Sequence, residues 1–356
     1  MRQKMELQMM RKRTGMRAGH VHTLLVVVMA LAGVANAAAE ADRQTGTSTS
    51  APTQPASPQI GSVEPSKVFP GPPLGGAGFS YGTGGVGLRN RGAGGIEISG
   101  VTAPVAAAYV YWDVLTNGPA PPAAGKIQVQ QLFPTMSAAK ILVGTMIGVG
   151  PSPCWAGTDT NTVYRAAIPL AIATGNGLYE VTVAKAGAGT RDGSDPYLVV
   201  VPPLWEGASM VVVGAGSGTV SIFDSGLAGN MFIPNTPFTY NLLLPAPTSG
   251  AQVLLDNIGA DGQHVASQSR VATAPSMTDE TTTVNGFLTA GPGSGYNDSD
   301  WNGSSGLPVP ELWDDTGHDI TSGAPAGTFS LNLSFSNGGA FPADCLVTVA
   351  NVVQQN

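Results

Sequence analysis

The 356 residues of this chain are 42% hydrophobic but only 11% charged, and the formal net charge is −7. The 48 glycines and 28 prolines exclude a mainly helical protein, because both residues destabilise helix interiors. The acidic balance excludes nucleic acid as a partner and disfavours an anionic membrane surface, since long-range electrostatics would repel both.

The N-terminus has the pattern of a secretory signal peptide. A basic region over residues 2–17 precedes an uninterrupted apolar stretch at residues 24–35, and small residues at 35–39 suit a signal peptidase. The apolar stretch is too short to span a membrane comfortably. We therefore expect residues 1–39 to be removed, leaving an exported chain with ten basic and 22 acidic residues, a net charge of −12 and no membrane span.

Two segments of unusual composition follow the signal peptide. Residues 40–74 are rich in Ala, Thr, Ser, Gln and Pro and have almost no aliphatic pattern, which predicts a disordered linker. Residues 75–95 are dense in glycine, and we expect a loop there.

Short β-rich runs, separated by Gly, Pro, Asn or Asp, occupy the rest of the chain. The expected strands are 106–112, 126–133, 140–147, 163–168, 178–184, 197–201, 208–213, 219–223, 238–244, 252–257, 314–320, 328–335 and 346–353. The run at 328–335 alternates polar and apolar residues, so one of its faces should be wet. The pattern predicts an all-β protein over residues 75–356: an antiparallel, jelly-roll-like β-sandwich, either one large or two packed smaller ones, with a sub-boundary near residue 230.

The only two cysteines, Cys154 and Cys345, both lie in the exported part. An oxidising compartment favours a single disulfide between them. Two buried free thiols are the alternative.

Several short motifs occur in a recognisable order. They are AYVYW at 108–112, YRA at 164–166, GNGLYEV at 175–181, EGASMVVV at 206–213, WNGS at 301–304, LWDD at 312–315 and DCLV at 344–347. From about residue 96 onward the chain resembles a secreted prokaryotic β-sandwich domain of unknown function found in bacterial and archaeal surface proteins. The resemblance implies a fold and a location at the cell surface, but no activity. Ala167 stands where that family carries an acidic residue, so no ligand role is implied there.

The last third of the chain is acidic and contains a fragment of a calcium-binding pattern. Asp-x-Asp-x-Asn-Gly at 298–303 resembles the opening of a calcium loop, in which alternate side-chain oxygens converge on the ion. The predicted Ca²⁺ ligands are Asp298, Asp300, Asn302, Asp314 and Asp315. Val309 occupies the position at which an EF-hand has its glutamate, so the alternative is a solvated turn stabilised by its own Asx side chains.

Signals of catalysis are weak. Residues 78–82 match G-x-S-x-G, but the strand and helix that flank a nucleophile elbow are not predicted around them. His318 is expected on the surface of a strand. A glycosidase would need two carboxyl groups across a cleft, and Asp298, Asp300, Asp314 and Asp319 are numerous enough to supply a pair.

Two functions from different classes follow. The first is an exported, non-enzymatic surface or extracellular-matrix protein, structural or adhesive, with Ca²⁺ as a candidate stabilising ion and a glycan or surface protein as its partner. Trp301 and Trp313 flank the acidic segment and are the predicted surface aromatics for such a ligand. The alternative is an extracellular carbohydrate-active hydrolase that uses the acidic residues.

Overall fold

The computed structural model describes residues 78–152, 159–183, 202–225, 231–232, 237–260, 280–291, 294, 300–301, 312–337 and 346–356. The chain divides into two compact units, Met1–Gln59 and Ile60–Asn356, and every described residue belongs to the second. The predicted signal peptide and linker, both cysteines, Asp298 and Asn302 lie outside the described residues.

The first half of the described chain forms two antiparallel sheets. Its strands are β1 (Phe79–Gly87), β2 (Ala93–Ile98), β3 (Thr102–Asn117), β4 (Lys126–Phe133), β5 (Lys140–Val143), β6 (Thr145–Pro151), β7 (Asp159–Ala167), β8 (Gly177–Val183) and β9 (Leu204–Ala215). One sheet has the order β1-β9-β3-β7-β6 and the other β2-β8-β4-β5. These two sheets pack face to face as the first sandwich.

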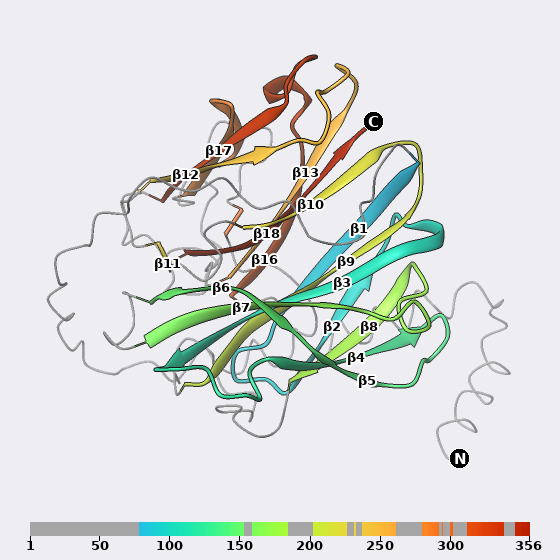
Figure 1. The fold of residues 1–356 in the computed structure, drawn as a ribbon, viewed down its shortest axis with the longest axis vertical. Helices are drawn as coiled ribbons and strands as arrows, with labels where there is room; N and C mark the ends of the chain where they lie inside the picture. Colours follow the sequence, from blue (N-terminus) through green and yellow to red (C-terminus); the bar gives the residue numbers. More distant parts are fainter. Residues whose placement is uncertain are drawn as a thin grey trace, which may run out of the picture. The chain divides into compact units, whose positions relative to one another are not determined.

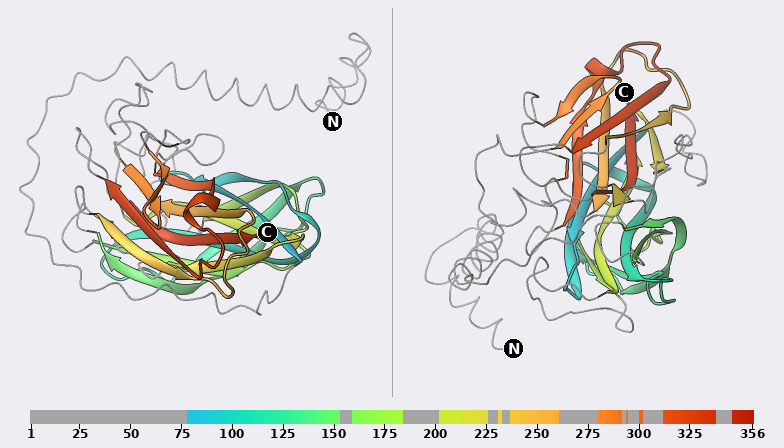
Figure 2. Two further views of the ribbon diagram at one scale, coloured as in Figure 1. Left: turned by 90° about the horizontal axis from the view of Figure 1, so that it is seen from above. Right: turned by 90° about the vertical axis from the view of Figure 1, so that its left-hand side faces the viewer.

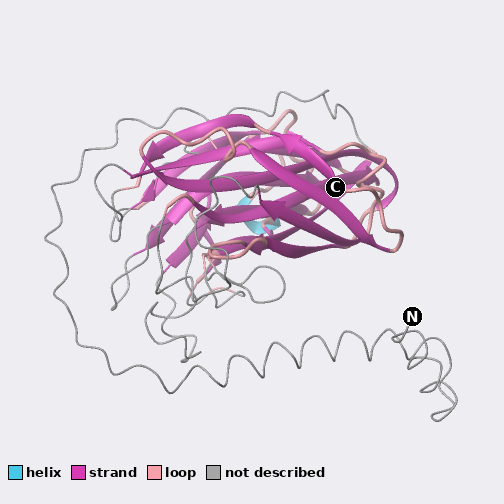
Figure 3. Cartoon of the chain, turned by 90° about the horizontal axis from the view of Figure 1, so that it is seen from below, coloured by secondary structure: helices cyan, strands magenta, loops and turns pink. Residues whose placement is uncertain are grey.

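The second half repeats this arrangement. Its strands are β10 (Thr219–Asp224), β11 (Met231–Phe232), β12 (Phe238–Leu243), β13 (Val253–Ala260), β14 (Glu280–Val284), β15 (Phe287–Ala290), β16 (Trp313–Asp319), β17 (Ser330–Asn337) and β18 (Leu346–Gln355). One sheet has the order β10-β18-β13-β16, with β11 also on β18, and the other β12-β17-β14-β15. Together they form the second sandwich, and strands dominate the described chain apart from one short helical turn, Thr321–Gly323 (Figure 3).

The two sandwiches stack to give four layers of sheet. From top to bottom, Figure 1 shows the β12–β17 sheet, the β10–β18 sheet, the β1–β9 sheet and the β2–β8 sheet, and Figure 2 gives two further views. Three apolar cores separate these layers. The all-β sandwich architecture predicted from the sequence is confirmed, in the form of two packed sandwiches.

Strand β3 shows how the sequence produces the inner layers. It is buried without interruption from Ala107 to Thr116, as a strand covered on both faces must be. Because side chains alternate between faces, Trp112 lies in the core of the first sandwich while Tyr111 lies in the core between the sandwiches.

The break between the sandwiches follows β9. Among the described strands, none of β1–β9 pairs with any of β10–β18. An isolated bridge joins Phe79 of β1 to Gly218, just before β10. The change of sandwich therefore falls at residues 216–218, before the position near 230 expected from the sequence.

The loop predicted at residues 75–95 is wrong where the structure describes it, because this segment forms β1 and begins β2. Glycine is needed there for close approach rather than for a loop. A Cβ on Gly82 would lie 2.1 Å from the carbonyl oxygen of Ser99, and one on Gly84 would lie 2.5 Å from that of Glu97. The G-x-S-x-G match is therefore part of a strand, and Ser80 donates its hydroxyl to the carbonyl of Ala215 at 2.7 Å.

Candidate functional site

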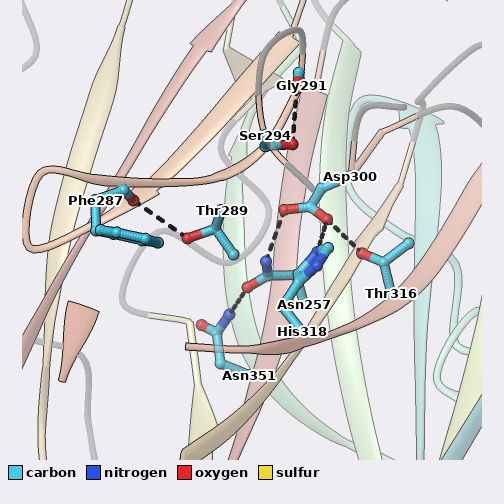
Figure 4. Close-up of polar contacts among 9 residues, drawn as sticks. All are labelled: Asn257, Phe287, Thr289, Gly291, Ser294, Asp300, Thr316, His318 and Asn351. Atoms are coloured by element: carbon cyan, nitrogen blue, oxygen red, sulfur yellow. Dashed lines mark hydrogen bonds and ion pairs between the residues drawn. The ribbon is translucent and has the colours of Figure 1, made fainter. Parts of the chain in front are cut away.

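Asp300 is the centre of a buried polar network in the second sandwich (Figure 4). Its Oδ2 accepts a hydrogen bond from Nδ2 of Asn257 at 2.9 Å. Its Oδ1 accepts one from Oγ1 of Thr316 at 2.8 Å and also pairs with Nε2 of His318. Both carboxylate oxygens of Asp300 are thus occupied by groups of the protein itself.

The network continues across the sheet to its partner layer. Asn257 lies opposite both Asn351 on β18 and Thr316 on β16, so the three side chains share one face. Nδ2 of Asn351 donates to Oδ1 of Asn257 at 2.8 Å, and the Tyr240 hydroxyl donates to Oδ1 of Asn351 at 2.9 Å. Because Tyr240 belongs to β12, this chain of hydrogen bonds ties the two sheets of the second sandwich together.

Two local contacts lie near this network in Figure 4. Oγ1 of Thr289 donates to the carbonyl of Phe287 at 3.3 Å, and Oγ of Ser294 donates to the carbonyl of Gly291 at 2.8 Å. Both shape the β15 segment and the turn after it.

Asp300 and His318 shift each other's pKa toward the charged form of both groups. Burial alone would raise the pKa of the Asp300 carboxyl, but the hydrogen bond and positive charge of His318 lower it below its usual value. Burial alone would lower the pKa of His318, but the hydrogen bond and charge of Asp300, with the charge of Asp256, raise it. His318 is therefore a buried partner of Asp300 and not the surface residue expected from the sequence.

A second acidic group lies on the opposite face of the same sheet, at the junction between the sandwiches. Asp256 on β13 accepts a hydrogen bond from the Tyr81 hydroxyl of β1. It also lies over Gly317, where a Cβ would be 2.4 Å from its Oδ1. Asp315 on β16 receives hydrogen bonds from Thr83 and Ser209, which belong to the first sandwich.

These two carboxyl groups do not ionise independently. Burial and the negative charge of Asp256 raise the pKa of Asp315 to about 7, although the Thr83 and Ser209 hydroxyls act in the other direction. Burial also raises the pKa of Asp256, which the Tyr81 hydrogen bond and the charge of His318 partly offset. At neutral pH the pair can hold a proton.

The structure separates the described members of the predicted calcium site. Asp314 and Asp315 are neighbours on β16 and so point to opposite faces, Asp314 to the side of His318 and Asp315 to the first sandwich. Asp300 has both oxygens occupied. Within the described ranges, no three His, Cys, Asp or Glu residues are grouped so that they could hold a metal ion.

The prediction that Trp301 and Trp313 are surface aromatics is wrong, because their exposed fractions are 1% and 0%. Trp301 packs against Gly259, where a Cβ would lie 1.5 Å from the ring, and meets Phe335 edge-on with ring centroids 5.5 Å apart. Trp313 covers Gly207, and its Nε1 donates to Oγ of Ser209 at 2.8 Å. Glycines opposite each ring make the space that these indoles fill.

Asp256, Tyr81 and Asn257 are site residues that the sequence pattern did not predict. One signal was present: Asp256 and Asn257 interrupt an otherwise apolar strand, Val253–Ala260, and a buried polar residue needs a partner. Tyr81 had no such signal, because its segment was expected to be a loop.

Comparisons with known proteins give no family for this chain. No family model and no curated protein matches it. Among solved structures, a chain of the 3.5 Å cryo-EM structure of the Sputnik virophage aligns with 88% of this chain and 91% of its own length, at 8% identity and a TM-score of 0.21. A TM-score this low carries no argument about fold or function. In the part of the chain that the structure describes, no helix is long and apolar enough to cross a membrane.

Proposed function

We propose that this chain is an exported, non-enzymatic protein of the cell surface or extracellular matrix, in which two packed β-sandwiches act as a structural or adhesive module. Its partner class is a glycan or another surface protein, and Ca²⁺ is a candidate stabilising ion. The observation that carries the proposal concerns Asp300. The sequence pattern placed this residue in a candidate calcium loop, but in the structure both of its carboxylate oxygens are bonded to side chains inside the second sandwich.

Two further ion pairs serve the same purpose. Arg89 and Glu206 pair within the first sandwich, where both side chains are buried. Arg165 on β7 pairs with Asp224 on β10, across the junction between the sandwiches, and the Tyr111 hydroxyl donates to the same carboxylate at 3.1 Å. Arg165 and Asp224 thus link the two sandwiches, whereas Arg89 and Glu206 link neighbouring parts of one sheet. Both pairs use charged side chains as internal contacts of the scaffold.

Export and surface location are tested directly in the organism that encodes the chain. An epitope-tagged chain should be recovered from the cell surface or matrix fraction, and its intact mass should show loss of roughly the first 39 residues. Recovery of the full-length chain from the cytoplasm would overturn the proposal. Deletion of the gene should weaken surface attachment or matrix cohesion, whereas unchanged attachment and cohesion would contradict the adhesive role.

One observation favours the hydrolase as the second candidate, namely the Asp256 and Asp315 pair. A carboxyl group with a pKa of about 7 beside a second carboxyl is the equipment of a general acid and its partner. The purified wild-type chain, D256N and D315N should be assayed on a panel of soluble polysaccharides, with the exposed D319N as the matched control. Hydrolysis that both pair variants abolish and D319N retains would establish the enzyme. Equal activity in all four would remove this pair from consideration.

A further inference from the structure

The first sandwich has an apolar edge formed by β5 and β6, and no further strand of the described ranges pairs with it. β5 is the last strand of one sheet and β6 is the last strand of the other. Only Gly144 separates them in the chain, so the edges of the two sheets are continuous (Figure 1). A Cβ on Gly144 would lie 2.4 Å from the Trp112 ring, which shows how closely the crossover is held to the core. The edge is therefore a fixed surface of the fold.

Large apolar side chains are exposed on these two strands. Ile141 and Val143 on β5 are 62% and 72% exposed, and Met146 and Val149 on β6 are 57% and 53% exposed. Residues 141–149 include no charged residue and no proline. Natural sheet edges are normally protected by such residues. Here Lys140 and Pro151 stand at the outer ends of the two strands and a register shift follows Met146, so the unprotected stretches are the shorter runs between them.

We infer that the β5–β6 edge is the interface through which two copies of this chain associate, edge to edge about a two-fold axis. An antiparallel strand edge is self-complementary, since the same row of N–H and C=O groups serves both copies. Lys140 is the only charged residue from 134 to 151, so nothing on this edge selects a strongly acidic or basic partner.

The apolar area is sufficient for a dimer. The hairpin before β5 adds Phe133 and Met136, which are also exposed, to the four side chains of the edge. With each of the six exposing on the order of 100 Å², the patch approaches the ~800 Å² per partner of a standard protein interface.

The charge of the chain gives the association a predicted salt dependence. Two copies of the exported form, each with a net charge of −12 (10 basic minus 22 acidic residues), repel one another, and the edge residues carry no charges that would neutralise this repulsion. Raising the salt concentration screens the repulsion, so the dimer should become tighter between about 0.05 and 0.5 M NaCl. Self-association of this kind requires neither export nor a glycan ligand.

Sedimentation velocity on the exported form of the chain, from roughly 0.1 to 100 μM, measures the dimer dissociation constant. V143K and M146K place a charge in the interface and should each raise this constant roughly a hundredfold or more. The matched control is F329K, which replaces a side chain of 66% exposure in the second sandwich and should change the constant less than about threefold. Because both edge positions are exposed in the single chain, neither lysine should disturb its folding, and thermal melts should coincide.

Hydrogen exchange gives a second readout that needs no variant. The backbone amides of β6 should exchange more slowly at high than at low protein concentration, while those of β10 should not change. A wild-type chain that stays monomeric over the whole range would overturn the inference, as would edge variants that dimerise like the wild type. Growth beyond a dimer would instead indicate open head-to-tail addition, for example of residues 40–74 of one copy to the edge of the next, and would also overturn it.

Discussion

Asp300 and His318 form a buried ion pair although one lies outside the strands and the other near the end of β16. The pair is completed by donors from Asn257 and Thr316, so that a single carboxylate connects β13, β16 and the segment that carries Trp301. Removing a carboxylate of this kind leaves several buried polar groups without partners at once.

Replacement of Asp300 by alanine should therefore be severely destabilising. The imidazolium of His318, the Asn257 amide and the Thr316 hydroxyl would all lose an acceptor, and breaking a buried ion pair costs about 3–5 kcal/mol. Urea denaturation at neutral pH measures the change in the free energy of unfolding. Asp319→Ala is the control: Asp319 is exposed and accepts from Nε2 of Gln252 at 2.9 Å, and its loss should cost less than about 1 kcal/mol. Equal costs for the two variants would show that burial does not set the strength of this pair.

The same ion pair should give stability a maximum in pH. His318 has a raised pKa in the folded state, so its contribution is complete below its unfolded value near 6.5 and is lost as the pH rises through the folded pKa. Asp300 has a lowered pKa, so its contribution is present above the unfolded value near 3.8 and is lost as the pH falls through the folded pKa. In His318→Gln the alkaline loss attributable to this residue should vanish. An unchanged alkaline limb in that variant would place its origin elsewhere.

The stability contribution of Asp315 should change with pH in the direction opposite to that of Asp300. Its folded-state pKa of about 7 lies above the unfolded value near 3.8, so the folded protein holds the proton more tightly. Stability therefore falls as the pH rises from about 4 to 7, and above that the full penalty of the buried charge is present. Asp315→Asn should be nearly neutral at about pH 4 and stabilising at about pH 8, measured by urea denaturation at both values. A variant that is destabilised more at the higher pH would show that ionised Asp315 is bound favourably, as it would be by a cation.

Much of the strand content could be predicted from the sequence, because burial on one or both faces leaves a period-two or continuous apolar pattern. The segment at 328–335 overlaps β17 at Ser330–Asn337, and 126–133 coincides with β4. β1 could not be found in this way. Its four glycines and one serine carry little apolar signal. Gly82, Gly84 and Gly85 are required by the close approach of residues 97–99 and of Trp313, which are contacts remote in sequence.

The site was harder to predict than the fold for the same reason. The spacing at 298–303 drew attention to Asp300 as a metal ligand, but spacing does not show that Asn257, Thr316 and His318 reach that carboxylate from other strands. Trp301 and Trp313 lie beside acidic residues, a pattern that is typical of glycan-binding surfaces. Only the glycines opposite their rings, Gly259 and Gly207, show that they are buried. Both errors arise from long-range packing.

Gly259 offers a test of how that packing supports the ion pair. A Cβ at this position would lie 1.5 Å from the Trp301 ring, and the ring has little room to retreat because it is buried against Phe335. Gly259→Ala should therefore cost about 3 kcal/mol or more in the free energy of unfolding, as overpacking of a rigid core does. Gly125→Ala is the control, since the nearest atom to its Cβ would be 3.3 Å away, and it should cost less than about 1 kcal/mol.

The consequence for Asp300 follows from its position next to Trp301 in the chain. Displacement of the Trp301 ring by Gly259→Ala should pull the Asp300 carboxylate away from His318, so that the imidazole loses the charge that raises its pKa. The pKa of His318, followed by NMR titration of its ring protons, should then move down from its raised value in Gly259→Ala and stay unchanged in Gly125→Ala. A His318 pKa that is the same in both variants would mean that Asp300 is held by its hydrogen bonds alone, with no support from the Trp301 packing.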